Sequence, residues 1–118
     1  MIVILTKPAT TEDIAKASQE YKSYIKITID IKNKRVAIGG EYHFDAEQEL
    51  LKLDSSQEDI WGGGLELTAK NIETFAMINV RAKTNPSQDI LNPRIKEQFC
   101  TIAHEYLSEF ANPPPAFH

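Results

Sequence analysis

Four isoleucines alternate with polar residues in one short segment: Ile25, Ile27, Ile29 and Ile31 are separated by Lys26, Thr28 and Asp30, and Lys32 follows. Successive side chains of a β-strand point to opposite faces, so this pattern predicts a strand with one buried and one solvated face. Asn33-Lys34 fits a hairpin turn, because Asn tolerates positive φ. Val36 and Ile38 then continue the alternation. We therefore expect an antiparallel hairpin, and the fold must be built around a sheet.

The chain after this hairpin allows two interpretations. Beyond Gly39-Gly40, Tyr42 and Phe44 keep the parity of the second strand, although a bulge at the glycines would shift it. Residues 45–53 fit either an extension of the strand or a short helix capped by Asp45, and we favour the helix. The two interpretations differ in which side chains share a face.

The other segments supply strands and two longer helices. Ile2 to Leu5 predicts a short strand, and Thr10 with Asp13 forms a capping box for a helix over about residues 11–22. Strands are also predicted over 60–67, which contains three glycines, and over 72–82, where apolar residues on both parities are typical of a central strand. Asn92 and Pro93 begin a last helix with one apolar stripe, formed by Ile95, Phe99, Ile102, Ala103, Tyr106, Leu107 and Phe110.

These elements predict an α+β fold, a mostly antiparallel sheet of about five strands with two main helices packed on it. The 118 residues are enough for a single domain, which we expect over residues 1–111, with a Pro-rich C-terminal tail at 112–118. The longest apolar run, Ile2 to Leu5, is too short for a membrane span or a secretory signal. Because the single Cys100 allows no internal disulfide, we expect a soluble, cytoplasmic protein.

The net charge of −4 is unevenly distributed. Residues 41–66 hold eight Asp or Glu and one Lys, whereas residues 1–40 hold seven Lys or Arg and four Asp or Glu. An acidic segment repels a phosphate backbone, and the chain has no basic run with interleaved aromatic residues. We therefore expect no nucleic-acid partner and no membrane partner. A cation, a metal or a basic partner suits the acidic segment better, although a solvated surface is the commoner explanation.

His43, Asp45 and Glu47 would project from one face if a strand runs through them. One imidazole and two carboxylates could then bind a divalent metal or act as acid and base, as in a metal-assisted hydrolase. In the alternative interpretation Tyr42 and Phe44 point inward and the three polar side chains face water. A helix beginning at Asp45 would remove the shared face altogether.

Two further segments could line a binding site. Trp61 beside Gly62-Gly63-Gly64 could wall a ligand, but we favour a core role for this tryptophan in a bulged strand. Asn79 and Arg81 share one face of the predicted strand over 72–82, and this face becomes polar toward its end. An arginine among amides suits a carboxylate or another anion, and a structural ion pair between Arg81 and one of the central acids is an equally good explanation.

Several pieces occur in a recognisable order: His43-x-Asp45-x-Glu47, Ser56 to Gly62 (Ser-Gln-Glu-Asp-Ile-Trp-Gly), Met77 to Arg81 (Met-Ile-Asn-Val-Arg) and Asn85-x-Ser87. Together they resemble a family of small uncharacterised prokaryotic proteins known only as a domain of unknown function. The resemblance implies a single self-contained cytoplasmic domain and carries over no catalytic residue, substrate or cofactor. This chain has Ala82 where the family pattern would have proline, which leaves the path of the next loop open.

We therefore predict a small soluble binding or accessory domain with a polar cleft framed by His43, Asp45, Gln57, Trp61, Asn79 and Arg81. One alternative is the metal-assisted hydrolase that uses His43, Asp45 and Glu47. Another is a protein-interaction module, including a homodimer, in which hairpin edges or the tail meet a partner. The first prediction requires that segments far apart in the chain converge.

Overall fold

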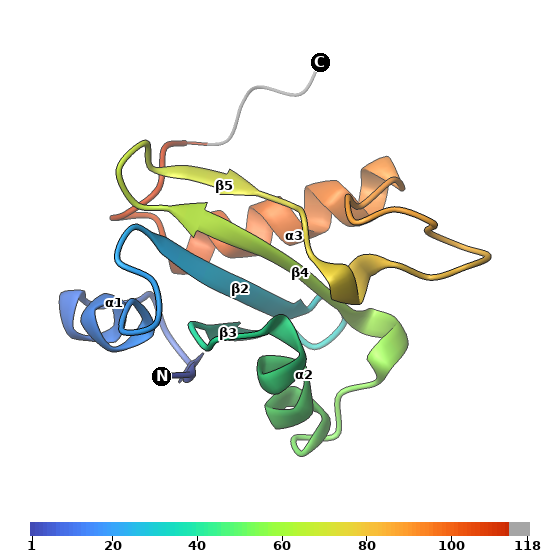
Figure 1. Ribbon diagram of the computed structural model, residues 1–118, viewed down its shortest axis with the longest axis horizontal. Helices are drawn as coiled ribbons and strands as arrows, with labels where there is room; N and C mark the ends of the chain where they lie inside the picture. The colour runs from blue at the N-terminus through green and yellow to red at the C-terminus, as the bar shows by residue number, and fades with distance from the viewer. Residues whose placement is uncertain (114–118) are drawn as a thin grey trace.

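The computed structural model describes residues 1–113 and contains a five-stranded antiparallel sheet with helices on both faces (Figure 1). The strand order is β1-β3-β2-β4-β5, with β1 (Val3–Leu5), β2 (Tyr24–Asp30), β3 (Arg35–Ile38), β4 (Ile60–Glu66) and β5 (Asn71–Glu73). The predicted α+β fold is confirmed. The predicted tail at 112–118 lies outside the described residues from position 114 onward.

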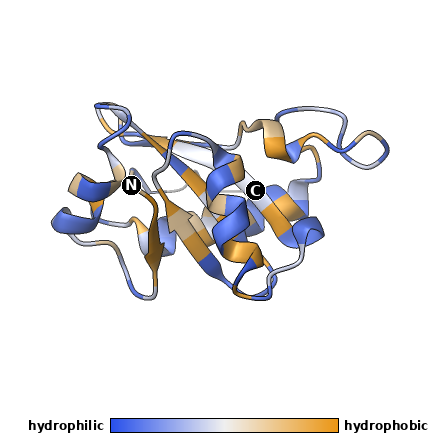
Figure 2. Cartoon of the chain, turned by 60° about the horizontal axis from the view of Figure 1, so that its bottom comes forward, coloured by the Kyte–Doolittle hydropathy of each residue, from blue (hydrophilic) through white to orange (hydrophobic). Residues whose placement is uncertain are grey.

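Helix α3 (Pro93–Tyr106) covers one face of the sheet, which we call the α3 face. Asn92 caps it by accepting hydrogen bonds from the backbone N–H groups of Arg94 and Ile95, as predicted. The core of this face combines the helical stripe with the alternating positions of the strands: Ile25, Ile27, Ile29, Val36, Ile38, Trp61, Leu65, Phe99, Ile102, Ala103 and Leu107. Figure 2 shows hydrophobic residues along the strands and hydrophilic residues on the connecting loops.

Helix α1 (Thr11–Ala17) begins with the predicted capping box of Thr10 and Asp13. It ends at Ala17, five residues before the predicted end, so the prediction of its length is wrong. None of the helices in residues 1–113 has the length and apolar character needed to cross a membrane.

Helix α2 (His43–Leu51) and the 3-10 helix η2 (Met77–Asn79) cover part of the opposite face, which we call the α2 face. Its core is small, formed by Ala37, Ala46, Leu50 and Ile60. Thr28 and Asp30 of β2 lie on this side and are fully buried. The prediction of a solvated face for β2 is therefore wrong here, because α2 packs against β2 on this side and the Ser55 hydroxyl binds Asp30.

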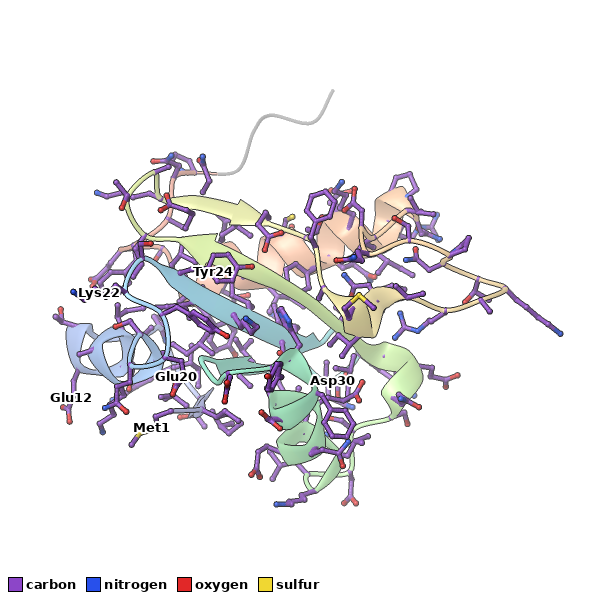
Figure 3. All side chains as sticks on the ribbon, viewed as in Figure 1. Met1, Glu12, Glu20, Lys22, Tyr24 and Asp30 are labelled. Carbon is purple, nitrogen blue, oxygen red and sulfur yellow. The ribbon has the colours of Figure 1, made fainter. Side chains whose placement is uncertain are left out.

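The predicted hairpin between β2 and β3 is confirmed, although Asp30 pairs with Arg35 and the positive φ of 54° falls at Lys34. Asp30 holds the turn together, since its carboxylate accepts hydrogen bonds from the backbone N–H of Asn33 at 3.0 Å and the Ser55 hydroxyl at 2.6 Å. Burial alone would raise the pKa of Asp30, but the hydrogen bonds from Ser55 and Asn33 outweigh burial and lower it. Figure 3 labels Asp30 and Tyr24 at the two ends of β2.

The prediction of a long strand over 72–82 is wrong. Strand β5 ends at Glu73, and the chain then turns into η2, with the buried side chain of Asn79 lying against β4. The Asn79 amide accepts a hydrogen bond from Gly62 N–H at 2.8 Å and donates one to the Gly62 carbonyl at 2.9 Å. An amide offers both a donor and an acceptor, so it satisfies the β4 backbone where β5 no longer does.

The three glycines of β4 allow close approach on both faces. A Cβ on Gly63 would lie 2.9 Å from the Phe99 ring, and one on Gly62 would lie 2.7 Å from the Cβ of Ala76. The Tyr24 ring covers Gly64, and its hydroxyl donates to the carboxylate of Glu73. Strand β4 pairs with β2 without interruption from Ile60 to Glu66, so the bulge that we associated with the glycines is absent.

Candidate functional site

Two hollows adjoin each other on the α2 face, and Ile78 of η2 lines both of them. The polar hollow, of about 340 Å³, is lined by Gln57, Glu58, Ile78, Val80 and Arg81. The apolar hollow, of about 260 Å³, is lined by Lys26, Tyr42, His43, Phe44, Met77 and Ile78. In Figure 1, η2 is the short yellow helix beside β4. Of the six residues predicted to frame one cleft, Gln57 and Arg81 line the polar hollow and His43 lines the apolar hollow, whereas Asp45, Trp61 and Asn79 line neither.

Arg81 is the central residue of the polar hollow. Its Cζ lies 3.6 Å from the centroid of the Trp61 ring, which is a cation–π contact. Its Nη2 donates hydrogen bonds to the backbone oxygen of Ile60 at 2.7 Å and to that of Gln57 at 3.1 Å. Its Nη1 is buried and has no hydrogen-bond partner within residues 1–113. The guanidinium is therefore held in place with one amino group unused.

Glu47 supplies a buried carboxylate near Arg81 and is only 3% exposed. Burial raises the pKa of Glu47, while the charge of Arg81 and the nearby Gln57 lower it. Burial also lowers the pKa of Arg81, against the charges of Glu47 and Asp59. Among the described residues no ion pair within 4.0 Å involves Arg81, so the structural ion pair that we considered does not form there.

Trp61 and Asn79, which we predicted to frame the cleft, line neither hollow. Trp61 is 4% exposed and belongs to the core of the α3 face, as we predicted for this residue. The Asn79 Nδ2 donates to the carbonyls of Thr74 at 3.1 Å and Gln88 at 2.8 Å, besides that of Gly62. Because the amide is engaged in this way, Asn79 positions η2 against β4 and does not line the hollow.

Asn85 organises the loop that follows Arg81. Its Nδ2 donates to the backbone oxygens of Asn79 at 3.0 Å and Asp89 at 2.8 Å, and its Oδ1 accepts from Leu91 N–H at 2.9 Å. The backbone of Asn85 also forms a β-bridge with Arg81. We did not predict Asn85 as a site residue, and its polar neighbours in the sequence resemble an ordinary turn.

The helix that we favoured over residues 45–53 is confirmed, although α2 begins earlier, at His43, so His43, Asp45 and Glu47 do not share one face of a strand. Helical spacing places His43 and Glu47 on the buried side of α2 and Asp45 on the exposed side. Asp45 lines neither hollow. No group of three or more His, Cys, Asp or Glu side chains in residues 1–113 is placed to hold a metal ion. The alternation on which the metal-assisted hydrolase depended is therefore not present.

His43 forms an uncharged wall of the apolar hollow. Its Nε2 lies 2.6 Å from the carbonyl oxygen of Gly63, so this nitrogen carries the proton and donates it. Burial lowers the pKa of His43 to about 4, and the charge of Lys26 acts in the same direction, whereas the Gly63 carbonyl opposes them. The imidazole is consequently neutral at pH 7.

A family model described as "Protein of unknown function (DUF5674)" matches residues 3–106 of the chain. The match covers most of the chain, so the protein belongs to this family, and the resemblance to an uncharacterised domain family is confirmed. No curated protein and no solved structure matches the chain. The family description assigns no activity, so the function has to be inferred from the two hollows.

Proposed function

For this member of a family of unknown function, we propose a small-molecule binding or accessory domain whose ligand occupies the polar hollow. The observation that supports this proposal is the Arg81 Nη1 group, which is buried without a hydrogen-bond partner in residues 1–113. A buried N–H group without a partner costs about 1–3 kcal/mol. Because Nη1 is closed to solvent, a ligand oxygen would recover that cost when the Arg81 side chain shifts toward the hollow.

The charges around Arg81 restrict the chemistry of the ligand. Glu58 lines the hollow, and the carboxylates of Glu47 and Asp59 both act electrostatically on Arg81. A multiply charged anion such as phosphate would be repelled by these acids. A ligand that combines an oxygen acceptor with an N–H donor suits both the guanidinium and the acids, and a primary carboxamide has this combination. We therefore narrow the predicted carboxylate or anion site to a carboxamide site.

The apolar side chains of the hollow suit a short aliphatic stem on such a ligand. Ile78 and Val80 line it beside the polar groups, and Val80 is exposed. Ligand sites typically combine apolar walls with a few polar groups that fix orientation. Free amino acids with an amide side chain, such as glutamine, have both parts.

Trp61 provides a direct test, because it is the only tryptophan of the chain and stacks on Arg81. We would titrate L-glutamine, L-glutamate and inorganic phosphate while recording tryptophan fluorescence. We expect L-glutamine to bind saturably, and L-glutamate to bind about tenfold more weakly, because it places a carboxylate among acids. Equal or tighter binding of L-glutamate, or no saturable change with L-glutamine, would contradict the carboxamide site.

Arg81→Lys is the matched variant, since it keeps the positive charge but removes Nη1 and the planar stacking surface. We expect it to weaken L-glutamine binding at least tenfold. His104→Ala on α3 is the control, because His104 lines neither hollow and the variant should bind as the wild type does. Binding that is unchanged in Arg81→Lys would place the ligand elsewhere.

We also propose that the protein acts in the cytoplasm. Its one cysteine, Cys100, is a free thiol, which suits a reducing compartment. Cell fractionation tests the location, and recovery of the protein outside the cytoplasmic fraction would contradict it.

A further inference from the structure

The rim of the apolar hollow exposes three large apolar side chains. Tyr42 is 60% exposed, Phe44 is 58% exposed and Met77 is 68% exposed, and all three line the same hollow. They come from the start of α2 and from η2, which are distant in the sequence. Clustered exposed apolar residues are uncommon on monomers and mark interaction surfaces, where aromatic residues and methionine are enriched.

The side chains that form the inner wall of this hollow are held in place and carry no charge. His43 is held by its hydrogen bond to the Gly63 carbonyl, and Ile78 packs against the α2-face core. Among residues 1–113, no acidic residue lines the hollow. An apolar side chain entering it would therefore displace water without desolvating a carboxylate.

Lys26 is the one cation that lines the apolar hollow in the part of the chain that the structure describes. Its Nζ lies 4.3 Å from the centroid of the Tyr21 ring and 5.6 Å from that of Tyr24. Within residues 1–113 no carboxylate lies within 4.0 Å of this nitrogen. Because the chain has a net charge of −4, an uncompensated lysine beside exposed aromatic residues is a distinct feature of this surface.

We propose that the apolar hollow docks a short acidic segment of a partner protein. The segment inserts one aromatic or large aliphatic side chain between Tyr42, Phe44 and Met77, and it places an adjacent carboxylate against Lys26. This surface is additional to the polar hollow and does not depend on a ligand there.

The size of the hollow and the spread of its rim favour a protein segment over a small molecule. At about 260 Å³ the hollow is smaller than typical ligand pockets of about 300–1,000 Å³, so it suits a single side chain. The exposed parts of Tyr42, Phe44 and Met77 extend outside the hollow, and only a larger partner would cover them.

A second copy of the chain is a poorer occupant. In a two-fold symmetric contact the same patch occurs on both subunits, so Lys26 would face a surface that also carries Lys26 and no lining acid. Like charges at an interface disfavour such a pairing. An acidic partner avoids this repulsion and also pairs the free lysine.

A displayed library of random peptides tests the proposal with the full-length protein. We expect selection on the wild type to enrich peptides in which an aromatic or large aliphatic residue lies beside Asp or Glu. Synthetic peptides of the enriched sequences should lose at least tenfold in affinity with Met77→Ser and with Lys26→Glu. Replacing the peptide acid by lysine should restore binding to Lys26→Glu but not to Met77→Ser.

Phe75→Ser is the matched control, because Phe75 is 55% exposed, similar to Phe44, but does not line the apolar hollow. We expect Phe75→Ser to bind the peptides as the wild type does and Phe44→Ser to bind at least tenfold more weakly. Thermal melts would establish that each variant folds. The proposal is overturned if selection shows no acidic or apolar preference, or if binding survives Met77→Ser. Light scattering that shows a dimer lost in Met77→Ser would instead assign the surface to a second copy.

Discussion

The two faces of the sheet differ in how their buried side chains are stabilised. On the α3 face, the odd-numbered isoleucines of β2 pack against the apolar stripe of α3. On the α2 face, the apolar cluster has only four fully buried residues, and the polar residues Thr28, Asp30 and Asn79 are buried beside it. Burial of apolar area stabilises the first face, and hydrogen bonds position much of the second.

This difference explains why both hollows that we assign to function lie on the α2 face. Packing of large apolar residues fills most of the α3 face, and in the hollow of about 290 Å³ between β5 and α3 the polar side chains of Glu73, Thr74 and Lys96 are already paired. On the α2 face short elements cover only part of the sheet, and Arg81 and Lys26 each keep an unpaired nitrogen among the described residues. One face therefore provides stability, while the other provides candidate binding groups.

The largest effect on stability should come from deleting the ring of Phe99 on the α3 face. Phe99 is fully buried and contacts the backbone of Gly63, which has no side chain to fill the space. We expect Phe99→Ala to reduce the free energy of unfolding by about 4 kcal/mol. Urea denaturation followed by circular dichroism measures this loss.

Leu50→Ala is the matched deletion on the α2 face. Leu50 is also fully buried, but its cluster is smaller, and we expect a loss of about 2–3 kcal/mol. If Phe99→Ala does not fold, Phe99→Leu should still fold and be destabilised. A loss for Leu50→Ala as large as that for Phe99→Ala would remove the distinction between the faces.

The sequence predicts the α3 face well because its residues follow simple periods. The β2 alternation and the stripe on α3 each require only local spacing, and Asn92 marks where the helix begins. The start of α2 has no such signal, since Tyr42 occupies the N-cap position and makes no side-chain cap hydrogen bond. Without a cap residue, the period-two pattern through Tyr42 and Phe44 left a strand open as the alternative to the helix that we favoured over residues 45–53, and it hid the earlier start of α2.

The candidate site was only partly predictable, because it depends on tertiary contacts. Gln57 and Arg81 do line one hollow, with Trp61 behind them, although 24 residues separate Gln57 from Arg81. Nothing in the spacing of residues along the sequence indicates that the Asn79 side chain replaces a neighbouring strand. Nor does it indicate that α2 places Glu47 near Arg81. Such pairings are fixed by how α2 and η2 lie on the sheet.

The second largest effect should follow removal of the Asn79 amide. Asn79→Ala leaves the Gly62 N–H and three backbone carbonyls without this partner, in a fully buried site. We expect a loss of about 3 kcal/mol in the free energy of unfolding, because buried unsatisfied groups cost about 1–3 kcal/mol each. Urea denaturation measures the loss, and limited proteolysis should show faster cleavage between residues 80 and 90.

Gln88→Ala is the control for Asn79, because Gln88 contacts Asn79 only through its backbone carbonyl and its own side chain is exposed. We expect this variant to have wild-type stability and wild-type proteolysis. If Asn79→Ala were as stable as Gln88→Ala, hydrogen bonds would not be what positions the α2 face.

The smallest of the three effects is a dependence of stability on pH through His43. The pKa of His43 is lowered to about 4 in the folded protein, against about 6.5 in an unfolded chain, so the unfolded state binds more protons between these values. Stability is then fully present above about pH 6.5 and falls as the pH is lowered. Between about pH 7.5 and about pH 5 we expect a loss of about 2 kcal/mol from this residue.

His43→Gln isolates the contribution of His43, since glutamine can donate to the Gly63 carbonyl but does not titrate. Glu47 has a raised pKa and acts with the opposite sign, whereas Asp30 has a lowered pKa and titrates below the pH range of the measurement. Both residues are common to the two proteins, so their effects cancel in the difference between the two urea-denaturation profiles. That difference should grow as the pH falls, because only the wild type has an imidazole that binds protons more readily in the unfolded state than in the folded one. Parallel profiles would mean that the imidazole is open enough to take up a proton in the folded state. That result would contradict our description of His43 as a buried, uncharged wall of the apolar hollow.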